Sequence, residues 1–540
     1  MNRLYYGDNL DVLREHIPDG SVDLVYLDPP FNSNRSYNVI FGNNVHDVND
    51  AAAQIQAFGD TWRWTPVTEQ QFQLYVGGQL PVSAADALTA FRALLGESDA
   101  MAYLVNMAPR LVELSRVLAP TGSLYLHCDS IMSHYLKVLL DAIFGISNFR
   151  NEIIWKRTSG HSDAGRYGRV HDVILFYTKG KKSVWNKQYQ PYGEEYVDQY
   201  YRYVEGETNR KFMSGDLSAA GLAGGGYEYV WNGIRRVWRC PEETMKRYEE
   251  EGRIFYTRNG MPRMKRYLDE SKGMPAQDVW ADIEPLRSWH QEKLAYPTQK
   301  PVELLERIIR ASSNEGDVVL DPFAGCGTTV DAAQSLKRRW IGIDITFIAV
   351  DLMEKRLIHV HGPGVAETYE ILGIPRDLGG AKALFRRSAF DFERWAVSQI
   401  NAQPNEKQVG DKGVDGVARF YLDKNKIGKI IASVKGGKIV TPSVVRDLLG
   451  TVESQKAQMG VLITMTKPSA GVLDAANHGG TYKWPLNNQI YPRVQVITVS
   501  ELLGGARPNT PPPLLPYIQA KRAEPKSTQI GFDELASEGA

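Results

Sequence analysis

The tetrapeptide Asp28-Pro29-Pro30-Phe31 combines residue types that could activate an amino group. It follows an apolar, β-branched run over 22–27, and proline cannot continue a central strand, so the strand is expected to end there. The Asp28 carboxylate and the Pro29 carbonyl are two acceptors for the hydrogens of an amine whose lone pair is delocalised into a ring. The prolines stiffen the loop, and Phe31 offers a stacking face for an extruded nucleobase. The plainer interpretation is a strand end followed by an exposed turn.

A second loop, Asp321-Pro322-Phe323-Ala324-Gly325-Cys326-Gly327-Thr328-Thr329, separates a strand over 318–320 from a helix. Glycines allow a sharp turn and close approach to a ligand. No lysine precedes the threonines, which disfavours a nucleoside triphosphate site. The next strand, over 340–344, ends at Asp344, where a carboxylate can accept hydrogen bonds from a ribose diol. A tight turn with a capping aspartate explains this pattern about equally well.

The elements that must position these loops alternate between strand and helix over 1–155 and again over 291–361. Such alternation predicts an α/β fold with a mostly parallel sheet covered on both faces. Between these halves, aromatic and arginine residues become dense and apolar periodicity weakens, as expected of an irregular inserted module. The predicted organisation is a first α/β half over 1–155, an inserted recognition module over 156–290, a second α/β half over 291–361, a linker over 362–385, a second α/β domain over 386–505 and a flexible tail over 506–540.

Composition narrows the function classes. The 540 residues are 43% hydrophobic, which is typical of globular domains, and 63 Lys and Arg residues balance 63 Asp and Glu residues. Zero net charge excludes a uniformly basic coat but permits a local basic groove. No apolar run is long enough for a membrane span, and no signal-peptide pattern opens the chain. Three widely spaced cysteines predict neither a disulfide framework nor a zinc site, so a cytoplasmic protein is expected.

Taken in order, the motifs resemble the amino-methylating DNA methyltransferases that use S-adenosylmethionine (SAM). Asp-Pro-Pro-Phe precedes Phe-x-Gly-x-Gly with a long insertion between them, which is the permuted order of the β group of that family. The resemblance covers roughly residues 1–360 and implies a Rossmann-like sheet. Further matching segments are Gly7-Asp8-Asn9, Tyr125-Leu126-His127-Cys128-Asp129, Asn151-Glu152-Ile153-Ile154-Trp155 and Tyr296-Pro297-Thr298-Gln299-Lys300-Pro301.

The resemblance implies roles for single residues. The catalytic positions are Asp28, Pro29, Pro30 and Phe31, with no metal in methyl transfer. The implied SAM-binding positions are Asp8, Thr298, Gln299, Lys300, Asp321, Phe323, Gly325, Gly327, Thr328 and Asp344. Aspartate at the first motif position is usual in adenine-N6 enzymes and serine in cytosine-N4 enzymes, so adenine is the expected target and cytosine the alternative.

Residues 386–503 carry a second set of chemically capable side chains. Acids and a lysine at strand ends could hold Mg²⁺ and activate water for phosphodiester cleavage. The set is Glu393, Asp415, Ser433 and Lys435. The stretch resembles Mrr-like restriction endonucleases of the PD-(D/E)XK type, in which Glu or Gln normally replaces Ser433, so Mg²⁺ is expected only if this domain cleaves DNA. The plainer interpretation is an ordinary hairpin with exposed charges.

The expected activity is site-specific methylation of adenine N6 in double-stranded DNA by base flipping. Arginines of the insertion are candidate DNA contacts, although each one alone is better explained as a solvated surface residue. They are Arg166, Arg169, Arg235, Arg236 and Arg239. Two alternatives remain open: a restriction-modification fusion whose C-terminal domain cleaves DNA, and a non-enzymatic DNA-binding regulator. A homodimer is a further assembly to test.

Overall fold

The computed structural model describes residues 1–30, 36–40, 54–59, 62–158, 160, 165, 167–219, 226–287, 290, 292, 299–404, 413–423, 426–437 and 439–513. The chain divides into two compact units. Unit 1 contains residues 1–186 and 278–540, and unit 2 contains residues 187–277.

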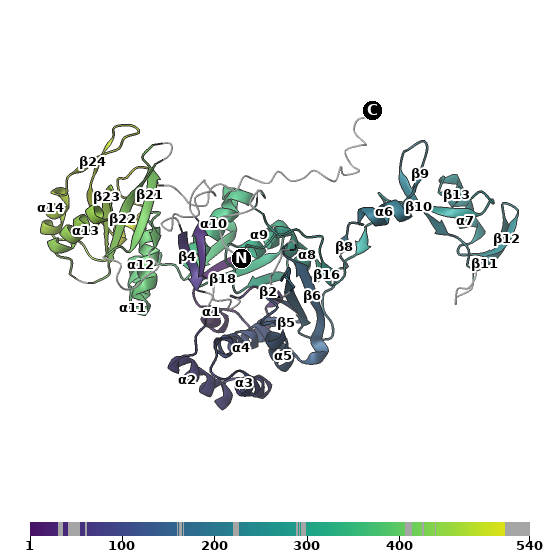
Figure 1. Ribbon diagram of the computed structural model, residues 1–540, viewed down its shortest axis with the longest axis horizontal. Coiled ribbons are helices and arrows are strands. Elements are labelled where there is room, and N and C mark those ends of the chain that lie inside the picture. The colour runs from purple at the N-terminus through teal and green to yellow at the C-terminus, as the bar shows by residue number, and fades with distance from the viewer. Residues whose placement is uncertain are drawn as a thin grey trace. The chain divides into compact units, whose positions relative to one another are not determined.

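Unit 1 is built on a nine-stranded mixed sheet (Figure 1). In spatial order its strands are β16 (Val279–Trp280), β6 (Phe149–Lys156), β7 (His171–Thr178), β5 (Leu118–Cys128), β2 (Val22–Leu27), β17 (Val318–Asp321), β18 (Arg339–Asp344), β1 (Asn2–Tyr6) and β19 (Tyr369–Leu372). The six strands from β5 to β19 run parallel, whereas β7 is antiparallel to both of its neighbours.

Helices cover both faces of this sheet because its strands are apolar on both sides. Leu24 packs on one face and Val25 on the other, and both are completely buried. The face that holds Leu24 is covered by α8 (Val302–Ser312), α9 (Thr328–Ser335) and α10 (Phe347–His361). The opposite face is covered by α1 (Asn9–His16), α4 (Asp99–Val117) and α5 (Ser133–Phe144), with α2 (Pro66–Leu74) and α3 (Val82–Leu95) packed beyond them.

The stretch 362–385 is more structured than the expected linker. It contains β19, which pairs in parallel with β1 from Asn2 to Tyr5, and most of α11 (Leu378–Arg387). Its glycines and prolines occur on either side of β19, where the chain turns, and only the four residues between them form the strand. A four-residue strand gives too little periodicity to be recognised in such a background.

The inserted unit is shorter and more regular than expected. β7 lies within the predicted insertion but belongs to the central sheet, because its run of apolar residues is buried between β5 and β6. Unit 2 itself contains antiparallel sheets and two helices. These are β8 (Tyr189–Gln190) with β15 (Met274–Pro275), the four-stranded set β9 (Tyr203–Val204), β10 (Lys211–Asp216), β14 (Pro262–Tyr267) and β13 (Ile254–Tyr256), the hairpin β11 (Tyr227–Trp231) and β12 (Ile234–Trp238), and helices α6 (Glu194–Tyr200) and α7 (Glu242–Glu250).

The C-terminal part of unit 1 has a sheet of its own. Its strands in order are β20 (Gln403–Pro404), β21 (Gly416–Tyr421), β22 (Ile427–Lys435), β23 (Met459–Thr464) and β26 (Val494–Thr498). The helices of this part are α12 (Ala389–Ser398), α13 (Pro442–Ser454), α14 (Ala470–Asn477) and α15 (Val499–Leu503). Among the described residues, no helix has the length and apolar character needed to cross a bilayer.

Candidate active site

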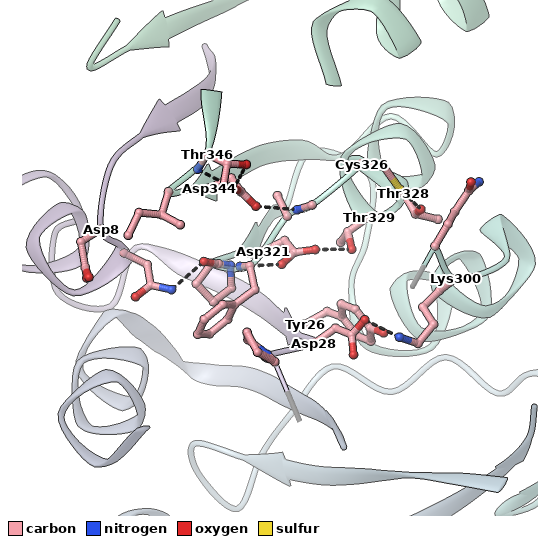
Figure 2. Close-up of a pocket in the computed structure, with 18 of the residues that line it drawn as sticks. Asp8, Tyr26, Asp28, Lys300, Asp321, Cys326, Thr328, Thr329, Asp344 and Thr346 are labelled. Atoms are coloured by element: carbon pink, nitrogen blue, oxygen red, sulfur yellow. Dashed lines mark hydrogen bonds and ion pairs between the residues drawn. The ribbon is translucent and has the colours of Figure 1, made fainter. Parts of the chain in front are cut away.

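The carboxyl ends of neighbouring parallel strands form one rim of the central sheet, and a cavity of about 460 Å³ opens there (Figure 2). Asp28 follows β2, Asp321 ends β17 and Asp344 ends β18, so three carboxylates reach the same cavity from adjacent strands. Ligands of open α/β sheets bind beyond these strand ends. The two loops singled out in the sequence, nearly 300 residues apart, therefore line one site.

Asp28 and Lys300 form an ion pair through Oδ2 and Nζ. Their side chains are only 16% and 10% exposed. The second carboxylate oxygen of Asp28, Oδ1, is buried and accepts no hydrogen bond from the described residues. A buried carboxylate oxygen without a donor is costly, and this favours a donor supplied by a ligand. Lys300 thus anchors one side of Asp28 and leaves the other available.

Asp321 shapes the glycine turn. Its carboxylate accepts hydrogen bonds from the Phe323 amide at 3.0 Å and from the Thr329 hydroxyl at 2.5 Å. Burial raises the pKa of Asp321 to about 7. Gly327 precedes α9 with φ of +76°, and a Cβ there would lie 2.5 Å from the Met353 side chain. Only glycine fits this turn, which makes the sequence motif a backbone requirement.

Asp344, at the end of β18, is the second carboxylate that holds the glycine turn. Its carboxylate accepts hydrogen bonds from the Gly325 amide at 3.0 Å and from the amide and hydroxyl of Thr346, both at 2.8 Å. Burial raises its pKa to about 6. Each oxygen of an ionised carboxylate has two acceptor positions, so Asp344 retains capacity for donors from a ligand.

Two polar contacts that hold the loops were not recognised from the sequence. Arg110 of α4 donates to both oxygens of Asp8 at 2.8 and 2.9 Å and to Oδ1 of Asn9 at 2.7 Å. Asn9 in turn donates to the carbonyl of Pro322 at 2.8 Å, which ties α1 to the glycine turn. Asp8 also caps α1 through the Leu10 amide. Arg110 sits in a mostly apolar helix with no motif around it, so no local signal marked it.

Asp331, in the helix that follows the glycine turn, contacts Arg356 and His361. Arg356 donates to it at 2.9 Å, and His361 approaches it at 2.8 Å. Burial acts to raise the pKa of Asp331, but Arg356 and His361 hold it below its ordinary value. Arg356 also donates to Thr328 at 3.0 Å, so this buried cluster fixes the start of α9 against α10.

A second buried chain of contacts runs beneath Asp28. The Tyr26 hydroxyl contacts Nδ1 of His127 at 2.9 Å, and Nε2 of His127 contacts Asp172 at 3.1 Å. Burial acts to raise the pKa of Asp172, but its hydrogen bond to His127 lowers it below the ordinary value. Tyr26 is on β2, two residues before Asp28, and it lines the cavity. The chain of contacts therefore supports the strand that ends next to Asp28.

The cavity collects most, but not all, of the site residues expected from the sequence. Those lining it are Asp8, Asp28, Pro30, Gln299, Lys300, Asp321, Phe323, Gly325, Thr328 and Asp344. Pro29 is buried and Gly327 packs on Met353, and neither lines the cavity. Phe31, Thr298 and Arg166 lie outside the described residues.

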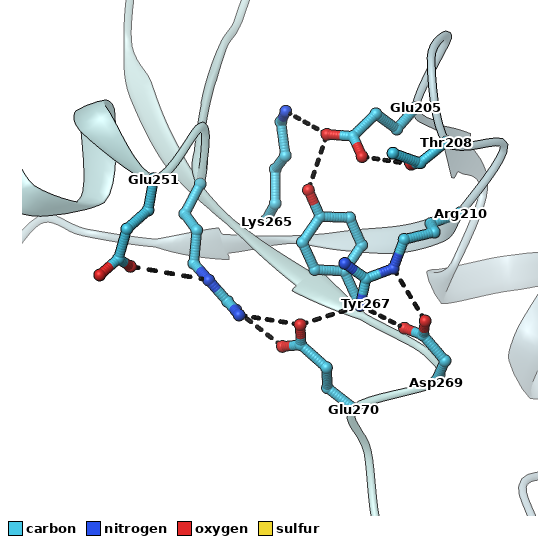
Figure 3. Close-up of polar contacts among 9 residues, drawn as sticks. Glu205, Thr208, Arg210, Glu251, Lys265, Tyr267, Asp269 and Glu270 are labelled. Carbon is cyan, nitrogen blue, oxygen red and sulfur yellow. Dashed lines mark hydrogen bonds and ion pairs between the residues drawn. The ribbon is translucent and has the colours of Figure 1, made fainter. Parts of the chain in front are cut away.

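Unit 2 neutralises many of its own charges (Figure 3). Arg210 donates to Asp269 and Glu270, all at 2.8 Å, and Arg253 donates to Glu270 at 2.7 and 2.8 Å. Glu205 accepts from Lys265 and Tyr267, both at 2.7 Å. These contacts, together with Thr208, lower the pKa of Glu205 to about 2.

Four of the five candidate DNA-binding arginines lie in the part of the chain that the structure describes, and their contacts differ. Arg235 and Arg236 extend into solvent from the β11–β12 hairpin, and Arg235 makes an exposed ion pair with Glu228. Arg239 donates to the Ser218 carbonyl at 2.8 Å and so helps to hold the fold of unit 2. Arg169 is exposed in unit 1, immediately before β7.

In the C-terminal part, Asp415, Ser433 and Lys435 come together where β22 ends. Oδ2 of Asp415 accepts hydrogen bonds from Val434 N at 2.6 Å and Ser433 Oγ at 3.2 Å, and Lys435 lies 4.0 Å away. Glu393 is on α12. The described residues contain no group of three or more His, Cys, Asp or Glu side chains able to hold a metal ion. Protein donors therefore already occupy one carboxylate oxygen of Asp415, Oδ2.

Comparison with known proteins gives two family matches. The model of an N6/N4 DNA methylase family matches residues 22–355. A family described as a NACHT-associated inactive restriction endonuclease matches residues 389–504. The matching family is described as an inactive restriction endonuclease, so the match supports a likeness to restriction endonucleases in this region and does not confirm that it is Mrr-like.

Curated relatives are DNA methyltransferases of restriction-modification systems. The type II methyltransferase M.EcaI of Enterobacter cloacae is 34% identical over 263 residues, which are 47% of this chain and 57% of the relative. The Mod subunit of the type III enzyme StyLTI of Salmonella typhimurium is 28% identical over 358 residues, which are 62% of this chain and 50% of the relative. The chain thus spans about half the length of these relatives.

Solved structures with likeness to the chain include two methyltransferases. The M1.HpyAVI–SAM complex matches with 16% identity and a TM-score of 0.32, covering 66% of this chain and 99% of that one. The cytosine-N4-specific PvuII DNA methyltransferase matches with 15% identity and a TM-score of 0.30, covering 66% and 86%. Since the family model extends over well more than half of the 540 residues and includes both loops of the cavity, this chain belongs to the N6/N4 DNA methylase family.

Proposed function

We propose that this protein transfers a methyl group from SAM to the N6 amino group of adenine in double-stranded DNA. The observation that carries the proposal is the cavity in which Asp28 faces the glycine turn and Asp344. One carboxylate oxygen of Asp28 pairs with Lys300, and the other is buried without a donor from the described residues. Aspartate at the start of the Asp-Pro-Pro-Phe motif favours adenine over cytosine, as expected from the resemblance.

The residues present fit SAM. Asp344 offers carboxylate oxygens for a ribose diol, the turn over 323–328 allows close backbone approach, and Gln299 and Lys300 line another part of the same cavity. SAM supplies an electrophilic methyl group on a sulfonium centre. The role of Asp321 is to hold the turn, through Phe323 and Thr329.

Asp28 acts on the target amine. Its free Oδ1 accepts an N–H hydrogen bond, which draws electron density toward the nitrogen and orients the lone pair. Lys300 holds the other oxygen, so the carboxylate does not need to reorient during the reaction. Tyr26, His127 and Asp172 fix β2 beneath it. Displacement at the methyl group then needs no covalent enzyme intermediate, and the amine proton passes to solvent by way of the carboxylate.

DNA contacts are proposed for the β11–β12 hairpin, because Arg235 and Arg236 are two adjacent solvent-exposed cations on it. Each phosphate contact contributes about 0.9 to the slope of log K against log salt. An Arg235→Ala/Arg236→Ala variant is expected to reduce that slope by up to about 2. Lys246→Ala on α7 is a matched control, because Lys246 is exposed and pairs with Glu242.

The deciding experiment incubates the protein with methyl-labelled SAM and unmethylated duplex DNA, then identifies the nucleosides by mass spectrometry. N6-methyladenine is the expected product. N4-methylcytosine would overturn the adenine assignment, and no methylated nucleoside on any of a diverse set of duplexes would overturn the activity. The exposed Asp11→Asn is a matched control for Asp28→Asn, because Asp11 lies on the surface of α1.

A further inference from the structure

Helix α12 belongs to the C-terminal part of unit 1, yet one side of it faces the methylase cavity. Phe392 and Trp395 are completely buried in the core of that part, whereas Asp391 and Arg394 line the cavity. Residues three apart lie on the same side of a helix, so both side chains project from one turn of α12. The cavity wall thus includes residues from outside the matched methylase region.

Asp391 and Arg394 line the same cavity as Asp344, Ile345 and Thr346. Tyr6, at the end of β1, interacts electrostatically with Asp391, Arg394 and Asp344, which places all three charged groups around it. Arg394 also packs over the Phe390 ring at 4.2 Å. Within the described residues, the Asp391 carboxylate has no hydrogen-bond donor, although its backbone amide bonds to Ser388.

The backbone fixes this placement. β19 extends the methylase sheet by pairing with β1, and only the turn over 373–377 separates it from α11, which packs on α12. A Cβ at Gly373 would lie 2.1 Å from the Tyr6 carbonyl, so the chain leaves the sheet in tight contact with β1. α12 also contacts α10, the helix that follows Asp344. The C-terminal part is therefore built onto the rim of the cavity.

We infer that α12 completes the adenosine end of the cofactor site, with Asp391 as hydrogen-bond acceptor and Arg394 as donor to the adenine ring. This inference rests on the proposed function. An adenine ring presents an exocyclic amino donor and ring-nitrogen acceptors, which a carboxylate and a guanidinium on one helix face complement. Asp344, the candidate ribose acceptor, lines the same cavity, and Tyr6 interacts electrostatically with it as well as with both α12 side chains.

The inference assigns the C-terminal domain a role in methylation that needs no nuclease activity. Cofactor binding would draw α12 and the rim together, because one ligand contacts both. The bound cofactor should therefore order α12, and substitutions on the cavity-facing side of α12 should alter cofactor affinity.

The test measures binding to the full chain by calorimetry, with SAM and with 5′-methylthioadenosine, which lacks the amino-acid end. Asp391→Ala and Arg394→Gln are each expected to weaken both ligands about tenfold or more, since a hydrogen bond to a charged group is lost. Asp447→Asn, an exposed acid on α13 of the same domain, should bind both ligands as the unaltered chain does.

A second measurement uses only the unaltered protein. Amide hydrogen exchange over 389–398 should slow when SAM is added, while exchange over α14 should not change. Weakened SAM with unaffected methylthioadenosine would place these side chains at the amino-acid end and overturn the assignment. Unchanged affinity in folded variants, or unchanged exchange in α12, would also overturn it. If the unaltered chain binds SAM and methylates DNA in those cases, only this inference fails and the proposed function remains.

Discussion

The ion pair between Asp28 and Lys300 allows the catalytic and structural contributions of Asp28 to be separated. Asp28→Ala removes a carboxylate from opposite an ammonium whose side chain is 10% exposed. Breaking one side of a buried pair costs about 3 kcal/mol, because the remaining charge stays desolvated. The folded state should therefore lose several degrees of thermal stability, independently of any effect on methyl transfer.

Catalysis should suffer separately. Loss of one preorganised group at the reacting atom typically lowers kcat by about 10²–10³-fold. The double variant Asp28→Ala/Lys300→Met removes both charges and should recover most of the stability, since the desolvated ammonium is removed together with its counterion. It should not recover activity. The single variant should therefore lose both thermal stability and turnover, whereas the double variant should regain stability but not turnover.

The assay combines thermal unfolding followed by circular dichroism with incorporation of labelled methyl groups into DNA at saturating SAM. Asp11→Asn again provides the control, with both quantities unchanged. If Asp28→Ala retains turnover within about tenfold of the unaltered enzyme, Asp28 does not activate the amine. If the double variant regains turnover, Asp28 is merely the counterion of Lys300, and the mechanism is wrong.

Three further predictions concern other features of the chain. Burial raises the pKa of Asp321 from 3.8 to about 7, so its ionisation destabilises the folded state progressively as pH rises from about 4 to 7, by at most about 4 kcal/mol. Asp321→Asn should therefore flatten the profile of stability against pH in that window. An unchanged slope would contradict this. Gly327→Ala should lower the melting temperature and weaken SAM binding because a Cβ does not fit at φ of +76°, whereas Gly364→Ala, where the space is open, should change neither. Plasmid DNA incubated with Mg²⁺ should remain uncut because protein donors occupy Asp415; Mg²⁺-dependent cleavage that Lys435→Ala abolished would refute this.

The placement of the two loops could be predicted from the sequence because each follows an apolar run that proline or glycine ends. Parallel strands bring their carboxyl ends to one rim, so Asp28, Asp321 and Asp344 were expected to meet once a parallel sheet was inferred. Those expectations depend on local pattern and topology, which a single sequence contains.

Other parts of the site depend on tertiary contacts that leave no local pattern. Arg110 looks like any charged residue of an amphipathic helix until its contacts with Asp8 and Asn9 are known. Asp391 and Arg394 lie far along the chain from the glycine turn, in a region expected to form a separate domain. The sequence also did not show that β7 belongs to the central sheet. Its residues lie inside the stretch predicted to be the insertion, and no break in the sequence separates them from it.

The edge strand β19 affects how the methylase can be isolated. A polypeptide ended at Gly362, shortly after the family match ends at residue 355, would expose the hydrogen-bonding groups of β1 along the outer edge of a parallel sheet. Such an edge invites pairing with other molecules, so aggregation of that fragment would say little about whether the C-terminal domain is needed for catalysis. A fragment extended to Arg376 keeps β1 covered and is the better starting point for dissecting the two halves.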